Sequence, residues 1–209
     1  NIKNIKNQRE KLRKGRQTFY ESNKEEEGAT NIAHRNQVNK TINQKKVDTG
    51  GPVRQMLNAF KDEGQRSLAS WLAPALLASI EHALVTCPRT NQVPALIPVP
   101  TCRSSRRRRG FDHVELLGTA VARSDSQYRT RRMLRDTRSD PGSKYLNAED
   151  RYARVREAFA VKRIIPSPGT PAILIDDIVT TGATAREATA TLVLAGMDVV
   201  AVATIAGTP

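Results

Sequence analysis

The sequence predicts an α/β fold in which a parallel sheet is flanked by helices. Short continuous apolar runs, which suit buried strands, alternate with segments whose apolar residues recur at helical spacing. Near the end of the chain, an apolar run at residues 172–175 precedes a helical segment at 183–195 and a second apolar run at 198–205. A strand–helix–strand succession of this kind places the two strands parallel, with the helix on one face of the sheet.

Helices are expected where a helix-starting residue precedes apolar residues spaced by three or four. Pro52 follows two glycines and suits the first turn of a helix that Gly64 ends. Ser67 can accept hydrogen bonds from the free N–H groups of the next helix. The expected helices cover residues 53–61, 68–84, 111–122, 183–195 and a segment that starts at Asn147 or Asp150 and ends at Phe159.

Strands are expected at three short apolar runs, residues 94–99, 172–175 and 198–205. Pro100 closes the first of them. Residues 124–147 are polar, basic and irregular, which predicts a long loop.

Residues 1–46 differ in composition from the rest of the chain. Asn and Lys dominate this segment, which carries +7 of the net charge of +13. Its sparse apolar residues cannot bury enough surface to offset the entropy of ordering, so a disordered basic tail is expected. The change of composition indicates a fusion, a mispredicted start or a genuine tail, with the folded domain at residues 47–209.

The chain shows no sign of export or membrane insertion at this level. It has no run of eighteen apolar residues, and its start is polar and basic, so neither a membrane span nor a secretory signal is expected. Cys87 and Cys102 are expected to be reduced thiols, which agrees with a cytoplasmic protein. A disulfide or a shared metal is the alternative, although two cysteines without nearby histidines make a poor zinc site.

The chemistry is concentrated in residues 173–184. An apolar strand delivers Asp176 and Asp177 at its carboxyl end, where ligands bind in open parallel sheets. The turn that follows is rich in hydroxyl groups, and its Gly182 lets a phosphate approach the backbone closely. The helix that begins there offers free N–H groups to an anion.

The two carboxylates narrow the choice of ligand. Beside a phosphate site they would repel the ligand, unless they meet sugar hydroxyls or a magnesium ion. The pattern is neither a P-loop nor a dinucleotide fingerprint, because the lysine of the first and the three-glycine spacing of the second are absent.

Residues 173–184 resemble the motif of type I phosphoribosyltransferases that binds phosphoribosyl pyrophosphate (PRPP). Further blocks are similar to the ComF family, often described as predicted amidophosphoribosyltransferases and linked to competence and DNA uptake. The resemblance covers about residues 48–207 and implies the type I phosphoribosyltransferase fold for residues 47–209. The blocks are Gly51-Pro52-Val53-Arg54, Ala59-Phe60-Lys61, Ile97-Pro98-Val99-Pro100, Arg109-Gly110-Phe111 and Ala158-Phe159.

The resemblance also implies site residues. Asp176 and Asp177 would act as catalytic residues that hold the ribose hydroxyls, and would meet Mg²⁺ largely through the substrate. The segment from Arg103 to Gly110 would be mobile and close over pyrophosphate. The residues implied to bind PRPP are Thr180, Thr181, Gly182, Ala183 and Thr184 for the 5-phosphate, and Val99, Pro100, Thr101, Arg108 and Arg109 for the diphosphate.

The sequence departs from the family pattern in three places. The cysteine-rich zinc ribbon that often opens ComF proteins is replaced by residues 1–46. Asp112 and His113 stand where Asn and Gln are common, and Ser143 and Arg154 fall where a Gln and an Asn are common. These positions bear on the acceptor and on activity, whereas the PRPP motif is intact.

The implied function is transfer of a phosphoribosyl group from Mg-PRPP to an unidentified nitrogenous acceptor. The alternative is a non-catalytic protein of the same fold that acts in DNA uptake by binding single-stranded DNA or competence proteins. The run from Arg106 to Arg109 fits pyrophosphate, DNA phosphates or plain solvent exposure. His113 is a candidate general base or a structural residue, and Trp71 a core or interface residue. A homodimer is suggested by analogy alone.

Overall fold

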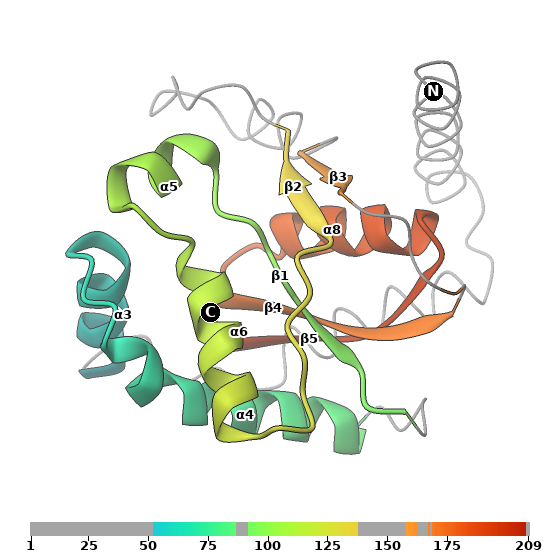
Figure 1. Cartoon of the computed structure of the whole chain (residues 1–209), viewed down its shortest axis with the longest axis horizontal. Helices are drawn as coiled ribbons and strands as arrows, with labels where there is room; N and C mark the ends of the chain where they lie inside the picture. Colours follow the sequence, from blue (N-terminus) through green and yellow to red (C-terminus); the bar gives the residue numbers. More distant parts are fainter. Residues whose placement is uncertain (1–51, 87–91, 138–157, 163–166, 168, 208–209) are drawn as a thin grey trace.

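The computed structural model describes residues 52–86, 92–137, 158–162, 167 and 169–207 (Figure 1). The predicted tail at residues 1–46 lies outside these ranges, as does most of the helix expected to end at Phe159. The described helices are α3 (Pro52–Asp62), α4 (Leu68–Thr86), α5 (Arg103–Arg109), α6 (His113–Ser124) and α8 (Ala183–Leu194). The described strands are β1 (Ala95–Pro98), β2 (Leu134–Asp136), β3 (Phe159–Val161), β4 (Thr170–Val179) and β5 (Met197–Gly207).

A parallel sheet of order β1-β4-β5 forms the centre of the described domain. Helices α4 and α6 cover one face of this sheet and α8 covers the other (Figure 1). The predicted α/β fold with a parallel sheet between helices is therefore confirmed. The finer assignment, the type I phosphoribosyltransferase fold, stays a prediction.

The two faces of β4 belong to two separate hydrophobic clusters. Ile173 and Ile175 pack among buried residues of α3, α4 and α6, whereas Ala172 and Leu174 pack among buried residues of α8 and β3. This alternation is that of a strand buried on both faces, and it explains why β4 reads as a continuous apolar run. Asp177 lies on the side of α3 and α6, where it contacts Lys61 and His113.

Residues 103–109 form helix α5, and Gly110 ends that helix in the left-handed conformation with φ of 76°. The mobility that the family resemblance implies for this segment stays a prediction. Two other expectations for the middle of the chain are wrong. The expected loop at residues 124–147 contains strand β2. Phe159 begins strand β3 instead of ending a helix, because β3 pairs antiparallel with β2 and Phe159 is buried beneath the pair.

Helix α4 has an unusually apolar composition. Within the described residues it is the one helix long and apolar enough to cross a membrane, although the sequence alone predicts no span. Leu72, Leu76 and Ile80 are buried in the core, so packing inside the domain accounts for part of that composition. Trp71 is 74% exposed, so its interpretation as a core residue is wrong.

Candidate functional site

The candidate site lies where the carboxyl ends of β1 and β4 meet. The N–H of Val99 donates a hydrogen bond of 2.9 Å to the carbonyl oxygen of Ile175, the residue before Asp176. The turn that contains Pro100 and Thr101 therefore lies beside the two carboxylates. The structure thus brings the turn after β1 next to the end of β4. These two segments are far apart in the sequence, and the family resemblance implies that both bind PRPP.

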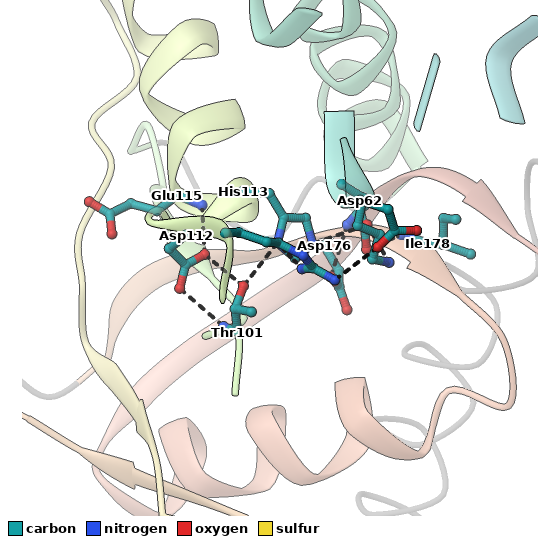
Figure 2. Close-up of polar contacts among 10 residues, drawn as sticks. Asp62, Thr101, Asp112, His113, Glu115, Asp176 and Ile178 are labelled. Atoms are coloured by element: carbon teal, nitrogen blue, oxygen red, sulfur yellow. Dashed lines mark hydrogen bonds and ion pairs between the residues drawn. The ribbon is translucent and has the colours of Figure 1, made fainter. Parts of the chain in front are cut away.

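Asp177 is held by protein groups on both carboxylate oxygens, among them His113 and Ile178, which Figure 2 labels. Its Oδ1 accepts a hydrogen bond of 2.8 Å from the N–H of Ile178. Its Oδ2 lies 2.6 Å from Nζ of Lys61 and 3.1 Å from Nε2 of His113. With 3% of its surface exposed, Asp177 depends on these partners in place of water.

The two neighbouring carboxyls have opposite electrostatic environments. Burial on its own raises the pKa of Asp177, but the hydrogen bond from His113 and the charge of Lys61 outweigh it, so that the pKa lies below its usual range. Burial, followed by the charge of Asp177, raises the pKa of Asp176 well above its usual range. Asp177 is therefore the permanently charged member of the pair, and Asp176 is the one whose charge is unfavourable.

The turn after β4 prepares an anion site at the start of α8. Gly182 is the N-cap residue with φ of 71°, and it offers no side-chain cap of its own to the helix start. Thr180 and Thr181 are exposed, and Oγ1 of Thr181 accepts a long hydrogen bond of 3.4 Å from the N–H of Ala183. Uncapped N–H groups and free hydroxyls are the groups that bind a phosphate.

On the other side of the carboxylates, helix α6 grips the turn after β1. Asp112, the N-cap of α6, accepts hydrogen bonds of 3.1 Å from both N and Oγ1 of Thr101 and one of 3.3 Å from the N–H of Glu115. Oγ1 of Thr101 also lies 3.0 Å from Nδ1 of His113. Two of the residues that depart from the family pattern, Asp112 and His113, thus contact this turn.

The arginines of α5 point to different places. The side chain of Arg109 is 9% exposed and turned inward, with its Nη atoms 3.3 Å from Oδ1 of Asp62 and 3.3 Å from Nδ1 of His113. Arg108 is exposed to solvent. Neither lines the cavity described next, which Arg103 and Arg106 do.

A cavity of about 250 Å³ opens beside the turn after β1. It lies between that turn, α5, the start of α6 and the β2–β3 pair, and its charged lining has five basic and three acidic side chains. Arg132 forms an ion pair with Glu115, and Asp112 is engaged by Thr101, so the lining leaves an excess of positive charge. The charged residues are Arg103, Arg106, Arg132, Arg135, Lys162, Asp112, Glu115 and Asp136.

Sequence reasoning missed several of these residues. Lys61 was noted only within a block of family resemblance, and nothing local in the sequence points from it to Asp177. Arg135 and Lys162 reach the cavity through the pairing of β2 with β3, which no single window of sequence reveals.

Magnesium fits this site only in part. Within the described residues, no group of three or more His, Cys, Asp or Glu side chains could hold a metal ion. Asp176 and Asp177 supply carboxylate oxygens, but Oδ2 of Asp177 already has His113 and Lys61 as partners. The donors therefore fit a Mg²⁺ ion that takes most of its ligands from water and a diphosphate substrate.

The chain is similar in sequence to known proteins that carry two different names. DNA utilization protein YhgH of Shigella flexneri is 30% identical over 147 residues, which cover 68% of this chain and 61% of the relative. Competence protein F of Haemophilus influenzae is 26% identical over 140 residues, covering 65% of this chain and 59% of the relative. The chain is a ComF relative.

The relationship confirms the resemblance that the motif blocks indicate. YhgH of Escherichia coli strain K12 is 29% identical over the same 147 residues. The chain spans about three fifths of the length of these ComF relatives (61% of YhgH and 59% of competence protein F). No family model matches the chain.

Proposed function

We propose that this ComF relative binds Mg-PRPP across the carboxyl ends of β1 and β4 and transfers its phosphoribosyl group to a nitrogen nucleophile. The hydrogen bond between Val99 and Ile175 carries the proposal, because it sets the turn after β1 beside the acidic pair. The 5-phosphate would bind the uncapped start of α8, and the ribose hydroxyls would meet Asp176 and Asp177. A cytoplasmic location is part of this proposal, because a chain with only two cysteines is typical of a reducing compartment.

The diphosphate would lie over the turn of Val99, Pro100 and Thr101 and extend into the 250 Å³ cavity. Arg103 and Arg106 border that cavity, so they, with Arg135 and Lys162, replace Arg108 and Arg109 as the expected diphosphate ligands. Guanidinium groups suit this role because they donate paired hydrogen bonds to phosphate oxygens.

The reaction is a substitution at the anomeric carbon. A nitrogen lone pair forms the new C–N bond, the C–O bond to the diphosphate breaks, and pyrophosphate leaves with the bonding electrons. Mg²⁺, when bound, would offset the charge of the leaving pyrophosphate. The chain's own residues would orient the ribose through its hydroxyls, hold the 5-phosphate still and stabilise the leaving group with cationic side chains.

Calorimetric titration of Mg-PRPP tests this proposal. Wild type should bind, and an Asp176→Asn/Asp177→Asn variant should not. Asp198→Asn is the matched control, because Asp198 lies in β5 opposite Pro171, at the other end of the sheet. Release of pyrophosphate on adding ammonia or another nitrogenous acceptor then tests catalysis. Absence of binding by a folded wild type overturns the proposal.

We propose as a second candidate a role in DNA utilization or competence through nucleic-acid or partner binding. The relatives' names and the exposed arginines of α5, namely Arg103, Arg106, Arg107 and Arg108, favour it. Salt-dependent binding of single-stranded DNA should then weaken in an Arg106→Glu/Arg107→Glu variant. Binding that is lost only when residues 1–46 are deleted points to a nonspecific polycation, and no binding at low salt rejects the role.

A further inference from the structure

A polar network of side chains surrounds Asp177. Lys61 and Asp62 end helix α3, Arg109 ends α5 and His113 begins α6, so three helix ends meet at one carboxylate of β4. The contacts run from Asp62 to Arg109, from Arg109 to His113, and from His113 and Lys61 to Asp177 (Figure 2). The proposed reaction, as described above, uses none of Lys61, Asp62 or His113.

The hydrogen-bond donors around His113 fix the position of its ring hydrogen. Arg109 can only donate, so the contact of 3.3 Å from its Nη1 requires Nδ1 of His113 to accept. The hydroxyl of Thr101 has one hydrogen, which it can give to Asp112 or to Nδ1, and neither choice needs a hydrogen on Nδ1. Nε2 then carries the hydrogen and donates it to Oδ2 of Asp177 over 3.1 Å.

The charges in the network are balanced without a charged imidazole. Lys61 pairs with Asp177, and Arg109 pairs with Asp62. The imidazole is buried, with 5% of its surface exposed, and packs edge-on against the ring of Phe60, with ring centroids 6.2 Å apart. Its orientation is thus fixed by an aromatic ring on one side and by hydrogen bonds at both nitrogens.

We propose that His113 and Lys61 are positioning residues, which hold Asp177 at Oδ2 in the orientation that its ligand meets, with His113 in the tautomer that carries hydrogen on Nε2. Lys61 supplies the positive charge that pairs with Asp177, and His113 supplies a directional hydrogen bond to the same oxygen. Without the imidazole, Oδ2 of Asp177 would contact only Lys61. The flexible four-carbon chain of a lysine does not hold the Asp177 side chain in a single rotamer. The consequence for ligand binding rests on the proposed function, whereas the tautomer does not.

A glutamine at position 113 offers a sharp control. Its amide has one donor group and one acceptor atom at its tip, so it can donate to Asp177 and accept from Arg109, as the imidazole does. Alanine and methionine supply neither. His82, exposed on α4, is the matched control histidine outside the network.

Two measurements on the full chain test the inference. In a long-range ¹H–¹⁵N correlation of the imidazole nitrogens, His113 should show a protonated Nε2 and an unprotonated Nδ1, and the spectrum of His113→Gln identifies its signals among those of the three histidines. In Mg-PRPP titrations, His113→Ala and Lys61→Met should bind roughly tenfold more weakly, the loss of one hydrogen bond to a charged group. His113→Gln and His82→Ala should bind as wild type does.

The outcomes separate the inference from the proposed function. If wild type does not bind Mg-PRPP, the proposed function fails and the tautomer alone decides the inference. A protonated Nδ1, or an equal mixture of both tautomers, overturns it. If wild type binds and His113→Ala binds equally well, the inference fails while the proposed function stands. Should His113→Ala not fold, weak binding by a folded His113→Gln variant contradicts the donor role.

Discussion

Gly118 of α6 lies so close to Ile175 of β4 that a Cβ atom at position 118 would meet Cδ1 of Ile175 at 2.8 Å and Oγ1 of Thr130 at 3.0 Å. This close approach lets α6 pack tightly on β4. As a result, His113 at the start of α6 reaches Asp177, two residues beyond Ile175. The packing of a glycine and the geometry of the candidate site are therefore linked.

Gly118→Ala should destabilise the domain. The added methyl group must displace a fully buried Ile175, which costs about 1–3 kcal/mol. Alanine gains roughly 1 kcal/mol in a helix, so we expect a net loss of up to about 2 kcal/mol. Urea unfolding measures the difference, with the exposed Arg123→Ala on the same helix as control. A variant as stable as wild type would show that α6 can move away from β4 at no cost.

Asp176→Asn should stabilise the protein at neutral pH. The raised pKa of Asp176 means that the folded state holds its proton more tightly than the unfolded chain. Stability from this group is present at acid pH and is lost as pH rises through the raised folded value, and asparagine removes that loss. When melting temperatures are measured from pH 8 down to pH 4, they should therefore rise less steeply toward acid pH in the Asp176→Asn variant than in wild type. Identical profiles for wild type and variant contradict the assignment.

Asp177→Asn should have the opposite effect. The lowered pKa of Asp177 gives stability that is present above the unfolded value and is lost as pH falls through the folded value. Asparagine also leaves Lys61 without its ionic partner, so we expect a loss of about 1–3 kcal/mol at neutral pH, measured by urea unfolding. A Lys61→Met/Asp177→Asn double variant that is more stable than Asp177→Asn alone would confirm that the unpaired lysine causes the loss. An unchanged stability in Asp177→Asn would argue against the ion pair.

Arg106→Ala and Arg107→Ala should differ in their effect on pyrophosphate. Arg106 lines the cavity beside the turn after β1, and Arg107 does not. Both are exposed on α5, so neither change should alter stability by more than about 0.5 kcal/mol. Calorimetric titration of Mg-pyrophosphate should show roughly tenfold weaker binding for Arg106→Ala alone. Equal weakening in both variants would indicate a diffuse charge effect instead of a cavity.

Asp112→Ala should loosen the turn after β1. It removes the N-cap of α6 together with both hydrogen bonds to Thr101, and loss of such a cap costs about 0.5–2 kcal/mol. Asp112→Asn keeps one capping oxygen but loses the second acceptor, which now serves the N–H of Thr101, so it should recover only part of that stability. Thermal unfolding of the two variants checks the order, and an asparagine variant as unstable as the alanine one would show that the charge matters more than the cap.

The sequence was enough to predict the sheet and the acidic pair, because both arise from local patterns. The apolar run of β4 and the turn to α8 lie within one window of residues, and the structure confirms each. Lys61 could not be assigned, since its contact with Asp177 depends on how α3 packs. Helix α5 was not predicted, although arginine is a good helix former and Gly110 is a natural helix end.

The most direct test of the account is a map of amide chemical shifts on addition of Mg-PRPP, with ribose 5-phosphate for comparison. The account predicts that ribose 5-phosphate shifts the amides of Gly182, Ala183 and Thr184, and that Mg-PRPP shifts these and also Val99 and Thr101. Shifts at both segments would show one ligand bridging β1 and β4. Shifts confined to α5, or none at all in the folded protein, would contradict the central claim.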